Sequence, residues 1–331
     1  MSKLIDRFGR EINYLRISVT DRCNMRCVYC MPPEGILHRP HDQILSFEEL
    51  YRIVNAAVRL GISKVRITGG EPLVRKNLPM LVKSLRSISG IQEIALTTNA
   101  IFLSEYAYLL KDAGLDRVNI SLDSLVPERF NEITRGGDLN KVLKGMEAAL
   151  LAGLQPLKIN VVLMKGFNDS EIISFAELGR LKPAHVRFIE YMSTSLIGNS
   201  YGDIFFSCKE AKQALGSLGE LEPVEDNHQF GTARVFRIRG FCGTIGFVSP
   251  VTSSFCSSCN KLRLTSDGHL RSCLHSAMAI DLKSEMEKGA SDEDLAMLIK
   301  EAVSLKPEAH NLLNEPLGVD SENFSMCQIG G

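Results

Sequence analysis

The sequence predicts an α/β fold: an incomplete (β/α)6, TIM-like barrel, followed by a smaller C-terminal α+β region that closes the barrel mouth. Three observations support this prediction. Between residues 14 and 191, short strand-like runs alternate with amphipathic helical segments, which is typical of repeated βα units around a parallel sheet. Most of these strand-like runs also alternate apolar and polar residues. After Ile197 the pattern changes, and short strands follow one another without helices between them.

The barrel elements follow from this pattern in chain order. Strands are expected at residues 14–20, 64–68, 93–98, 117–122, 157–163 and 185–191. Helices are expected at residues 47–60, 78–88, 104–113, 141–152 and 170–181. Ser46 and Glu49 have the spacing of a capping box at the start of the first helix. Gly61, Gly114 and Gly153 lie where helices should end.

The remainder of the chain predicts a different organisation. A helix is expected at 208–218, short paired strands at 233–238 and 244–248, and amphipathic helices at 281–288 and 292–304. We therefore expect two parts. Residues 1–200 form the partial barrel with one group of cysteines, and residues 201–331 form a region with a second group and a Gly-Gly tail.

Composition excludes several classes of protein. The 331 residues are 44% hydrophobic and 23% charged, as in an ordinary globular protein, and the formal net charge of −1 offers no general attraction to nucleic acid or to an anionic membrane. No apolar run is long enough for a membrane span, and no secretory signal is visible at the N-terminus. Clustered cysteines then favour metal chemistry in the cytoplasm over a disulfide framework.

Positive side chains occur on the polar faces of the predicted strands. If the apolar faces pack under the helices, these cations point into the barrel: Arg16, Lys64, Arg66, Lys158 and Arg187. Buried cations are costly without anionic partners. The sequence therefore favours a phosphate-bearing ligand inside the barrel, and the alternative is internal pairing with Asp123 and Glu190.

Three thiols follow the first predicted strand: Cys23, Cys27 and Cys30. A zinc site usually has four protein ligands, which His38 or His41 could complete. An iron-sulfur cluster is normally held by four cysteines, so a cluster on three would leave one iron open. Buried thiols without metal are the remaining alternative.

A second group of three thiols lies near the C-terminal end: Cys256, Cys259 and Cys273. A zinc site there would need His269 or His275 as the fourth ligand. Lys261 and Arg263 add positive charge next to these thiols, which suits an electron-rich cluster or the anionic end of a ligand.

The loop after the second predicted strand has the sequence Gly69-Gly70-Glu71-Pro72. Adjacent glycines permit backbone conformations closed to other residues and let a ligand approach the main chain closely. Loops at the carboxyl ends of barrel strands are where such folds place their active sites.

The spacing Cys-x3-Cys-x2-Cys with Tyr29 before Cys30, together with the Gly69-Gly70-Glu71-Pro72 loop, resembles the radical S-adenosylmethionine (SAM) superfamily. The second cysteine group, Pro250-Val251-Thr252, Ser266-Asp267-Gly268 and the terminal Gly330-Gly331 resemble its molybdenum cofactor biosynthesis protein A family, the GTP 3',8-cyclases. The resemblance covers essentially the whole chain.

The resemblance implies an enzyme, a lyase that carries out the first step of molybdenum cofactor (molybdopterin) biosynthesis. Its cofactors would be two 4Fe-4S clusters and SAM. A 5'-deoxyadenosyl radical from SAM would take the 3'-hydrogen from the ribose of GTP, and the C3' radical would attack C8 of guanine. The product would be (8S)-3',8-cyclo-7,8-dihydroguanosine 5'-triphosphate, and no protein acid or base is expected.

The resemblance also assigns residues. One cluster would lie on Cys23, Cys27 and Cys30, and the other, facing the guanine, on Cys256, Cys259 and Cys273. The residues that match SAM-contacting positions are Tyr29, Gly70, Ser121 and Met192. Those expected to bind GTP are Arg16, Lys64, Arg66, Thr97, Lys158, Arg187, Lys261, Leu262 and Arg263. Gly330 and Gly331 would assist from the tail. Many family members have Arg where this chain has Lys261.

Partners follow from the same resemblance. They are the GTP substrate, a reductant protein such as flavodoxin or ferredoxin, and the next enzyme of the pathway, cyclic pyranopterin monophosphate synthase. A homodimer is one assembly that the resemblance allows. Two other functions compete: a peptide-modifying radical SAM maturase with an auxiliary cluster, and a non-catalytic zinc-binding module.

Overall fold

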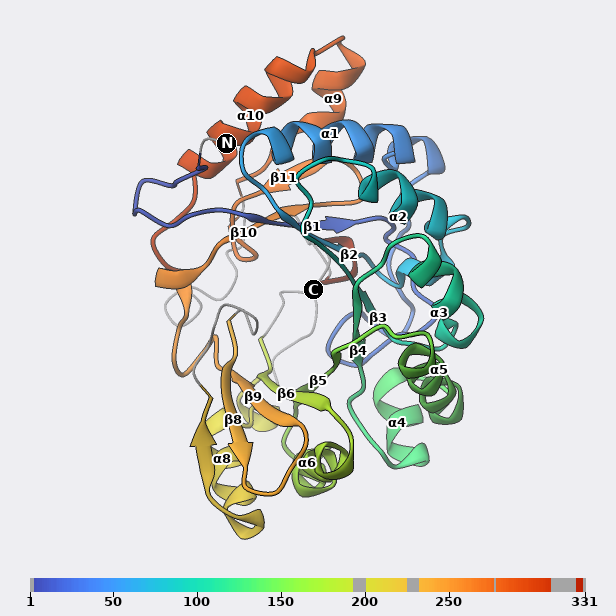
Figure 1. The fold of residues 1–331 in the computed structure, drawn as a ribbon, viewed down its shortest axis with the longest axis vertical. Coiled ribbons are helices and arrows are strands. Elements are labelled where there is room, and N and C mark those ends of the chain that lie inside the picture. The colour runs from blue at the N-terminus through green and yellow to red at the C-terminus, as the bar shows by residue number, and fades with distance from the viewer. Residues whose placement is uncertain (1–2, 193–200, 225–231, 277, 311–325, 330–331) are drawn as a thin grey trace.

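A computed structural model of the chain describes residues 3–192, 201–224, 232–276, 278–310 and 326–329. The described strands form one twelve-stranded sheet in the order β12-β11-β10-β1-β2-β3-β4-β5-β6-β9-β8-β7. Its middle, from β10 to β9, is parallel, and both ends are antiparallel. The sheet curls around a central space, with helices on its outer side (Figure 1).

Six consecutive parallel strands make the barrel, and their bounds are β1 Tyr14–Ser18, β2 Lys64–Thr68, β3 Glu93–Thr98, β4 Arg117–Ser121, β5 Leu157–Leu163 and β6 Ala184–Glu190. The helices between them are α1 Phe47–Arg59, α2 Leu78–Arg86, α3 Leu103–Asp112, α4 Pro127–Thr134, α5 Leu139–Leu151 and α6 Ile172–Leu181. The predicted incomplete (β/α)6 barrel is confirmed.

The later strands extend the same sheet at both edges. They are β7 Leu221–Pro223, β8 Arg234–Ile238, β9 Thr244–Val248, β10 Lys261–Leu264, β11 His269–Arg271 and β12 Ile280–Asp281. The later helices are α7 Tyr201–Ile204, α8 Cys208–Ala214, α9 Leu282–Glu287, α10 Asp292–Ser304 and α11 Met326–Ile329. Short 3-10 turns are His41–Gln43, Pro72–Val74, Asp169–Glu171, Leu215–Leu218 and Cys256–Ser258.

Two features of this arrangement differ from the sequence prediction. Helix α4 was not expected, because it is short and has few apolar residues, and β7 and β10 to β12 were not expected as strands. The predicted hairpin of β8 and β9 is present, but β9 also pairs in parallel with β6, as β10 does with β1. Pairing between segments so distant in sequence leaves no local pattern. The division into residues 1–200 and 201–331 stays a prediction.

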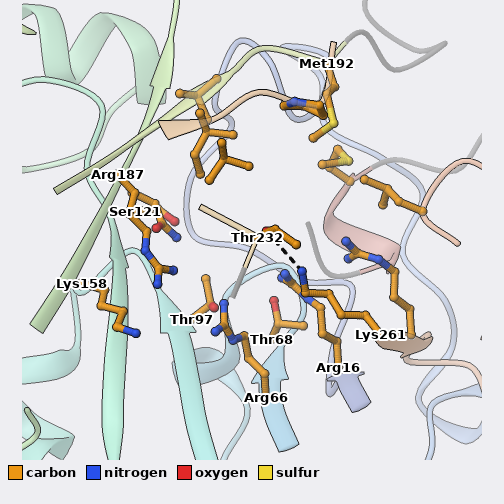
Figure 2. Close-up of a pocket in the computed structure, with 18 of the residues that line it drawn as sticks. Arg16, Arg66, Thr68, Thr97, Ser121, Lys158, Arg187, Met192, Thr232 and Lys261 are labelled. Atoms are coloured by element: carbon orange, nitrogen blue, oxygen red, sulfur yellow. Dashed lines mark hydrogen bonds between the residues drawn. The ribbon is translucent and has the colours of Figure 1, made fainter. Parts of the chain in front are cut away.

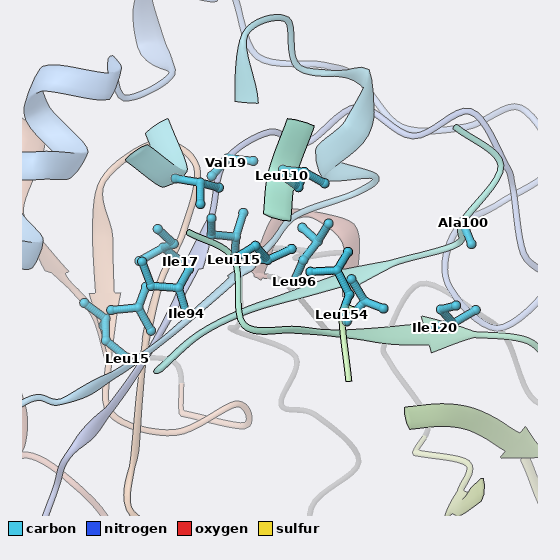
Figure 3. Packing of buried hydrophobic residues seen from close by; sticks show 14 of the residues in the cluster. Leu15, Ile17, Val19, Ile94, Leu96, Ala100, Leu110, Leu115, Ile120 and Leu154 are labelled. Atoms are coloured by element: carbon cyan, nitrogen blue, oxygen red, sulfur yellow. The ribbon is translucent and has the colours of Figure 1, made fainter. Parts of the chain in front are cut away.

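The apolar strand faces pack under the helices, as the alternation predicted. Leu15, Ile17, Ile94 and Leu96 are at most 1% exposed and belong to one continuous hydrophobic cluster (Figure 3). Burial of such side chains is the main favourable contribution to folding. The polar residues between them must therefore face the inside of the curled sheet.

Local signals define the helix ends. The Ser46 side chain accepts a hydrogen bond from the Glu49 backbone N–H (3.1 Å), and the Glu49 carboxylate accepts one from the Ser46 N–H (2.6 Å), so the predicted capping box is confirmed. Gly114 follows α3 with φ +99°, a conformation that favours glycine. Among the described residues, no helix combines the length and apolar content needed to cross a bilayer.

We predict that Gly145→Ala destabilises the fold. Gly145 lies on α5, and a Cβ atom there would be 2.4 Å from the carbonyl oxygen of Ala100 and 3.1 Å from Cβ of Leu103. Because backbone must move to relieve these contacts, we expect a loss of about 1–3 kcal/mol in the free energy of unfolding. Urea denaturation measures it. Gly216→Ala is the matched control, since its Cβ would meet no atom within 4 Å; equal stability of the two variants would contradict the prediction.

Candidate active site

A cavity of about 720 Å³ lies inside the curled sheet (Figure 2). It is lined by residues from the inner faces of the barrel strands and from the loops beyond them. Both groups of thiols line this one cavity: Cys23, Cys27, Cys30, Cys256, Cys259 and Cys273. Segments separated by more than two hundred residues in the sequence therefore meet around one space, which is the candidate site.

The Gly69-Gly70-Glu71 loop supports the segment that leads into the first thiol group. The Gly70 N–H donates to the carbonyl of Thr20 (2.8 Å), and the Glu71 N–H donates to the carbonyl of Arg22 (2.8 Å). A Cβ atom on Gly70 would lie 2.3 Å from that Arg22 oxygen. Only glycine fits this approach, which explains why the two sequence motifs occur together.

The Glu71 carboxylate connects this loop to the end of β3. It accepts hydrogen bonds from the Leu73 N–H (3.0 Å), the Thr98 hydroxyl (2.7 Å) and the Asn99 N–H (2.7 Å). Asn99 in turn donates through Nδ2 to the side chain of Asn24, inside the thiol loop (2.8 Å). Burial raises the pKa of Glu71 to about 7, against the lowering effect of these donors. The thiol loop is thus tied to two neighbouring strand ends.

Tyr29 ties the thiol loop to the opposite side of the cavity. Its hydroxyl donates to Asp123 Oδ2 (2.6 Å), and Asp123 Oδ1 accepts from the Val162 N–H on β5 (2.8 Å). Burial raises the pKa of Asp123 to about 6 and that of Tyr29 well above its ordinary value. The Asp123 carboxylate is therefore occupied by hydrogen bonds that hold the thiol loop in place.

The two thiol groups differ in their electrostatic surroundings. Burial raises the pKa of Cys23 to about 12 and that of Cys27 further. Burial acts the same way on Cys259, but Lys306 and Lys261 outweigh it and lower the pKa of that thiol. Lys306 is 2% exposed and donates to the carbonyls of Lys261 (2.8 Å) and Ser272 (2.6 Å). Cys259 of the second group thus lies in a positive environment, which favours its thiolate.

The thiols suit a cluster better than a single ion. Within the described part of the chain, no group of three or more His, Cys, Asp or Glu side chains is arranged to hold one metal ion. An iron-sulfur cluster uses cysteine thiolates, each on its own iron atom, so its ligands surround a larger volume. Three sulfur donors that line the cavity fit that requirement at each site; the first three lie on one loop, and the second three lie before β10 and after β11.

The histidines proposed for zinc lie mostly elsewhere. His38 and His41 are not among the residues that line the cavity, and His38 Nδ1 is 3.8 Å from Asp21. His269 also lies outside the lining, with Nδ1 3.3 Å from Asp267. His275 does line the cavity, and burial lowers its pKa to about 4. Of the four histidines, His275 is the one that lines the same cavity as the thiols.

The cations line the cavity as the alternation predicted. The five expected from the alternation are Arg16, Lys64, Arg66, Lys158 and Arg187. Lys261 and Arg263, next to the second thiol group, also line the cavity, as does Arg117, which the sequence analysis did not single out. Figure 2 shows Arg16, Arg66, Lys158 and Arg187 pointing toward one space. Leu262 is different: it is 0% exposed and lies in the hydrophobic core, because alternation along β10 turns it away from the face that carries its two basic neighbours.

Mutual repulsion and burial act on these cations. Burial, together with the nearby charges of Arg187, Arg117 and Arg66, lowers the pKa of Lys158 to about 6. Burial likewise lowers the pKa of Arg187 to about 9. Removing positive charges from water is costly unless an anion compensates them. The cavity is therefore suited to a polyanion.

The carboxylates considered as internal partners bond other groups. Asp123 holds Tyr29 and β5, and Glu190 accepts from the N–H groups of Cys208 (3.1 Å), Val251 (3.1 Å) and Thr252 (3.0 Å). Two buried oxygens facing the cavity, Thr97 Oγ1 and Asn160 Oδ1, have no hydrogen-bond partner among the described residues. Both observations favour a bound ligand over pairing of the cations with Asp123 and Glu190.

The structure brings together nearly all the residues that the sequence singled out. Tyr29, Gly70, Ser121 and Met192 line the cavity, as does Thr97. Gly330, Gly331 and the 193–200 loop lie outside the described residues. Sequence reasoning missed Lys306, which follows an ordinary amphipathic helix, and Thr232, whose hydroxyl accepts from Lys261 Nζ (3.3 Å). It also missed the role of Glu190, whose carboxylate accepts hydrogen bonds from the backbone of Val251 and Thr252 and so holds the Pro250-Val251-Thr252 motif in place.

We predict that Gly70→Ala lowers metal binding at the first thiol group. The added methyl displaces the Arg22 carbonyl and the loop that carries Cys23, Cys27 and Cys30. After anaerobic reconstitution with iron and sulfide, the variant should hold clearly less iron per chain than the unaltered protein, because the displaced loop no longer offers its three thiolates to a cluster. Gly216→Ala is the control and should load normally. Full loading of Gly70→Ala would contradict this account of the loop.

Comparisons with known proteins agree with this geometry. Residues 17–179 match the Radical SAM superfamily, and residues 184–312 match Molybdenum Cofactor Synthesis C. The GTP 3',8-cyclase of Moorella thermoacetica is 48% identical over 326 residues, covering 98% of this chain and 99% of that protein. The GTP 3',8-cyclase of Pelotomaculum thermopropionicum is 46% identical over 327 residues, covering 98% and 99%.

Structural similarity is broader and concerns the fold alone. The crystal structure of Streptococcus suis SuiB bound to S-adenosylmethionine has a TM-score of 0.59 and 16% identity, covering 87% of this chain and 67% of that one. Membership of the radical SAM superfamily implies a 4Fe-4S cluster and SAM as cofactors. On sequence identity along nearly its full length, the chain belongs to the GTP 3',8-cyclase family of radical SAM enzymes.

Proposed function

We propose that this protein converts GTP into (8S)-3',8-cyclo-7,8-dihydroguanosine 5'-triphosphate, the first step of molybdenum cofactor biosynthesis. The relatives of nearly equal length carry the name GTP 3',8-cyclase. The observation that carries the proposal is the cavity itself, which is lined by two groups of three thiols and by eight lysine and arginine side chains. A nucleoside triphosphate has the charge that this space needs.

Cys23, Cys27 and Cys30 are the proposed ligands of the cluster that works with SAM. Tyr29, Gly70, Ser121 and Met192 are proposed to hold SAM beside it, and their place in the cavity lining supports this. Bound there, the cofactors would supply a 5'-deoxyadenosyl radical able to take hydrogen from C3' of the ribose, so that C3' could bond to C8 of guanine. The protein's task is to hold the reacting carbons close together.

Cys256, Cys259 and Cys273 are proposed to hold a second 4Fe-4S cluster. Support comes from their all-sulfur donor set and from the positive charge of Lys306 and Lys261, which stabilises thiolates. A cluster there would leave an open iron facing the guanine end of the substrate.

The cations are proposed to bind the triphosphate. Arg16, Arg66 and Arg187 can form bidentate bonds to phosphate oxygens, and Lys158 adds a point charge. Lys64, Lys261, Arg263 and Thr97 complete the proposed set, to which Leu262 could contribute only through its backbone. The surrounding strands and helices exclude water from the radical's vicinity. The downstream synthase, the reductant protein, the homodimer and the assisting role of Gly330 and Gly331 stay predictions.

An anaerobic assay tests the proposed function. Protein incubated with GTP, SAM and a strong reductant should release 5'-deoxyadenosine only when GTP is present. Cys23→Ala should abolish this release, because it removes a ligand of the SAM cluster. Cys242→Ser, at an exposed thiol away from the cavity, is the control and should retain activity. Bound zinc without iron, or radical formation with a peptide instead of GTP, would reject the cyclase.

GTP binding should also take up a proton. Lys158, with a pKa near 6, is mostly neutral in the ligand-free protein at pH 7.5. A triphosphate beside it raises that pKa, so one proton is absorbed on binding. The affinity should therefore fall as pH rises from 7 to 8.5, by up to about tenfold per pH unit for one coupled group.

Anaerobic calorimetry in two buffers of different ionisation enthalpy measures this uptake. Lys158→Arg is the matched variant, since Arg keeps its charge throughout this range and should bind GTP without the proton. Equal proton uptake by both proteins would contradict the assignment to Lys158.

A further inference from the structure

A fourth thiol lies beside the first thiol group. Cys327 is on α11, nearly three hundred residues after Cys30 in the sequence, and is 2% exposed. It lines the same cavity as Cys23, Cys27 and Cys30. In Figure 1 the dark red helix α11 lies within the curve of the sheet, near β2. The last described segment of the chain therefore places a sulfur atom in the lining of the site.

The contacts of Cys327 are with the cluster cysteines themselves. The thiols of Cys30 and Cys327 are hydrogen-bonded to each other. Cys327 also contributes to the raised pKa of Cys23, after the larger effects of burial and of the Glu71 charge. Cys30 thus has Cys327 as an immediate neighbour. No such fourth thiol lines the cavity beside Cys256, Cys259 and Cys273 within the described residues.

The position of Cys327 matters because of the way in which a 4Fe-4S cluster is held. Three cysteines satisfy three of the four irons in a 4Fe-4S cluster, and the fourth iron has no protein ligand. SAM would reach that iron through the cavity, which Cys23, Cys27 and Cys30 line. Cys327 lines the cavity and touches the ligand set, so its sulfur lies on the same side as the open position.

We propose that Cys327 is a displaceable fourth ligand, which binds the open iron until SAM arrives. The inference rests on the cluster that family membership implies at Cys23, Cys27 and Cys30. As the Cys327 sulfur bonds to iron, the thiol proton passes to water. When SAM binds, its amino and carboxylate groups replace the sulfur, the iron–sulfur bond of Cys327 breaks, and the thiolate takes up a proton again. No electron is transferred.

Two effects distinguish such a ligand from a thiol that only fills space. The fourth iron should be retained better during oxidation, because a thiolate holds it. SAM should bind less tightly, because it must first displace the thiolate; a cap present in about nine of ten molecules weakens the apparent affinity about tenfold. Removing the thiol should therefore reduce iron retention and strengthen SAM binding together.

The experiment compares the unaltered protein with Cys327→Ala and Cys327→Ser, all with reconstituted clusters and without SAM. Mild anaerobic oxidation is followed by electron paramagnetic resonance, which detects the three-iron cluster left when the open iron is lost. Both variants should form several-fold more of this species. Cys242→Ser, which removes an exposed thiol, should match the unaltered protein. Equilibrium binding of SAM should be several-fold tighter in Cys327→Ala.

The outcomes separate this inference from the proposed function. If the variants load iron normally but show the same three-iron fraction and SAM affinity as the unaltered protein, Cys327 is not a ligand, and the cyclase proposal stands. A change in thermal stability alone would likewise assign Cys327 to packing and overturn the inference. Protein that takes up no iron at Cys23, Cys27 and Cys30 would overturn both.

Discussion

Arg16, Arg66, Lys158 and Arg187 point from neighbouring strands into one enclosed space, where water screens their charges little. The barrel must therefore accommodate several buried positive charges in one place. Burial lowers the pKa of Lys158 and Arg187, so the protein without ligand keeps these groups at a cost in free energy. A polyanion removes that cost, and the same charges that make the cavity unfavourable when empty make it selective when occupied.

The loops at the strand ends hold the first group of thiols in place beside this charged cavity. Gly70 and Glu71 bond to the backbone of the segment before Cys23, and Glu71 also bonds to the end of β3. Tyr29 and Asp123 fix the other side of the thiol loop. Because these bonds come from rigid strands, the cysteines keep their positions relative to the cations, as a reaction between two bound ligands requires.

The two thiol groups have different electrostatics, and this difference matches their proposed roles. Positive charge from Lys306 and Lys261 lowers the pKa of Cys259, so this group is prepared to bind metal beside an anionic substrate. The first group has thiol neighbours instead, among them Cys327, and its pKa values are raised. A neighbouring thiol can compete for iron there, which a lysine cannot do.

Local patterns were enough to predict the barrel, its inward cations and the two groups of three thiols. Those patterns are the alternation along β1 to β6, the Cys-x3-Cys-x2-Cys spacing and the capping signals of α1. Which distant segments meet became visible only in the folded chain. Parallel pairing of β10 with β1 brings Cys259 to the cavity, β9 joins β6, and α11 delivers Cys327 to Cys30. Such contacts depend on closure of long loops and on packing, and neither leaves a periodic trace in the residues that make them.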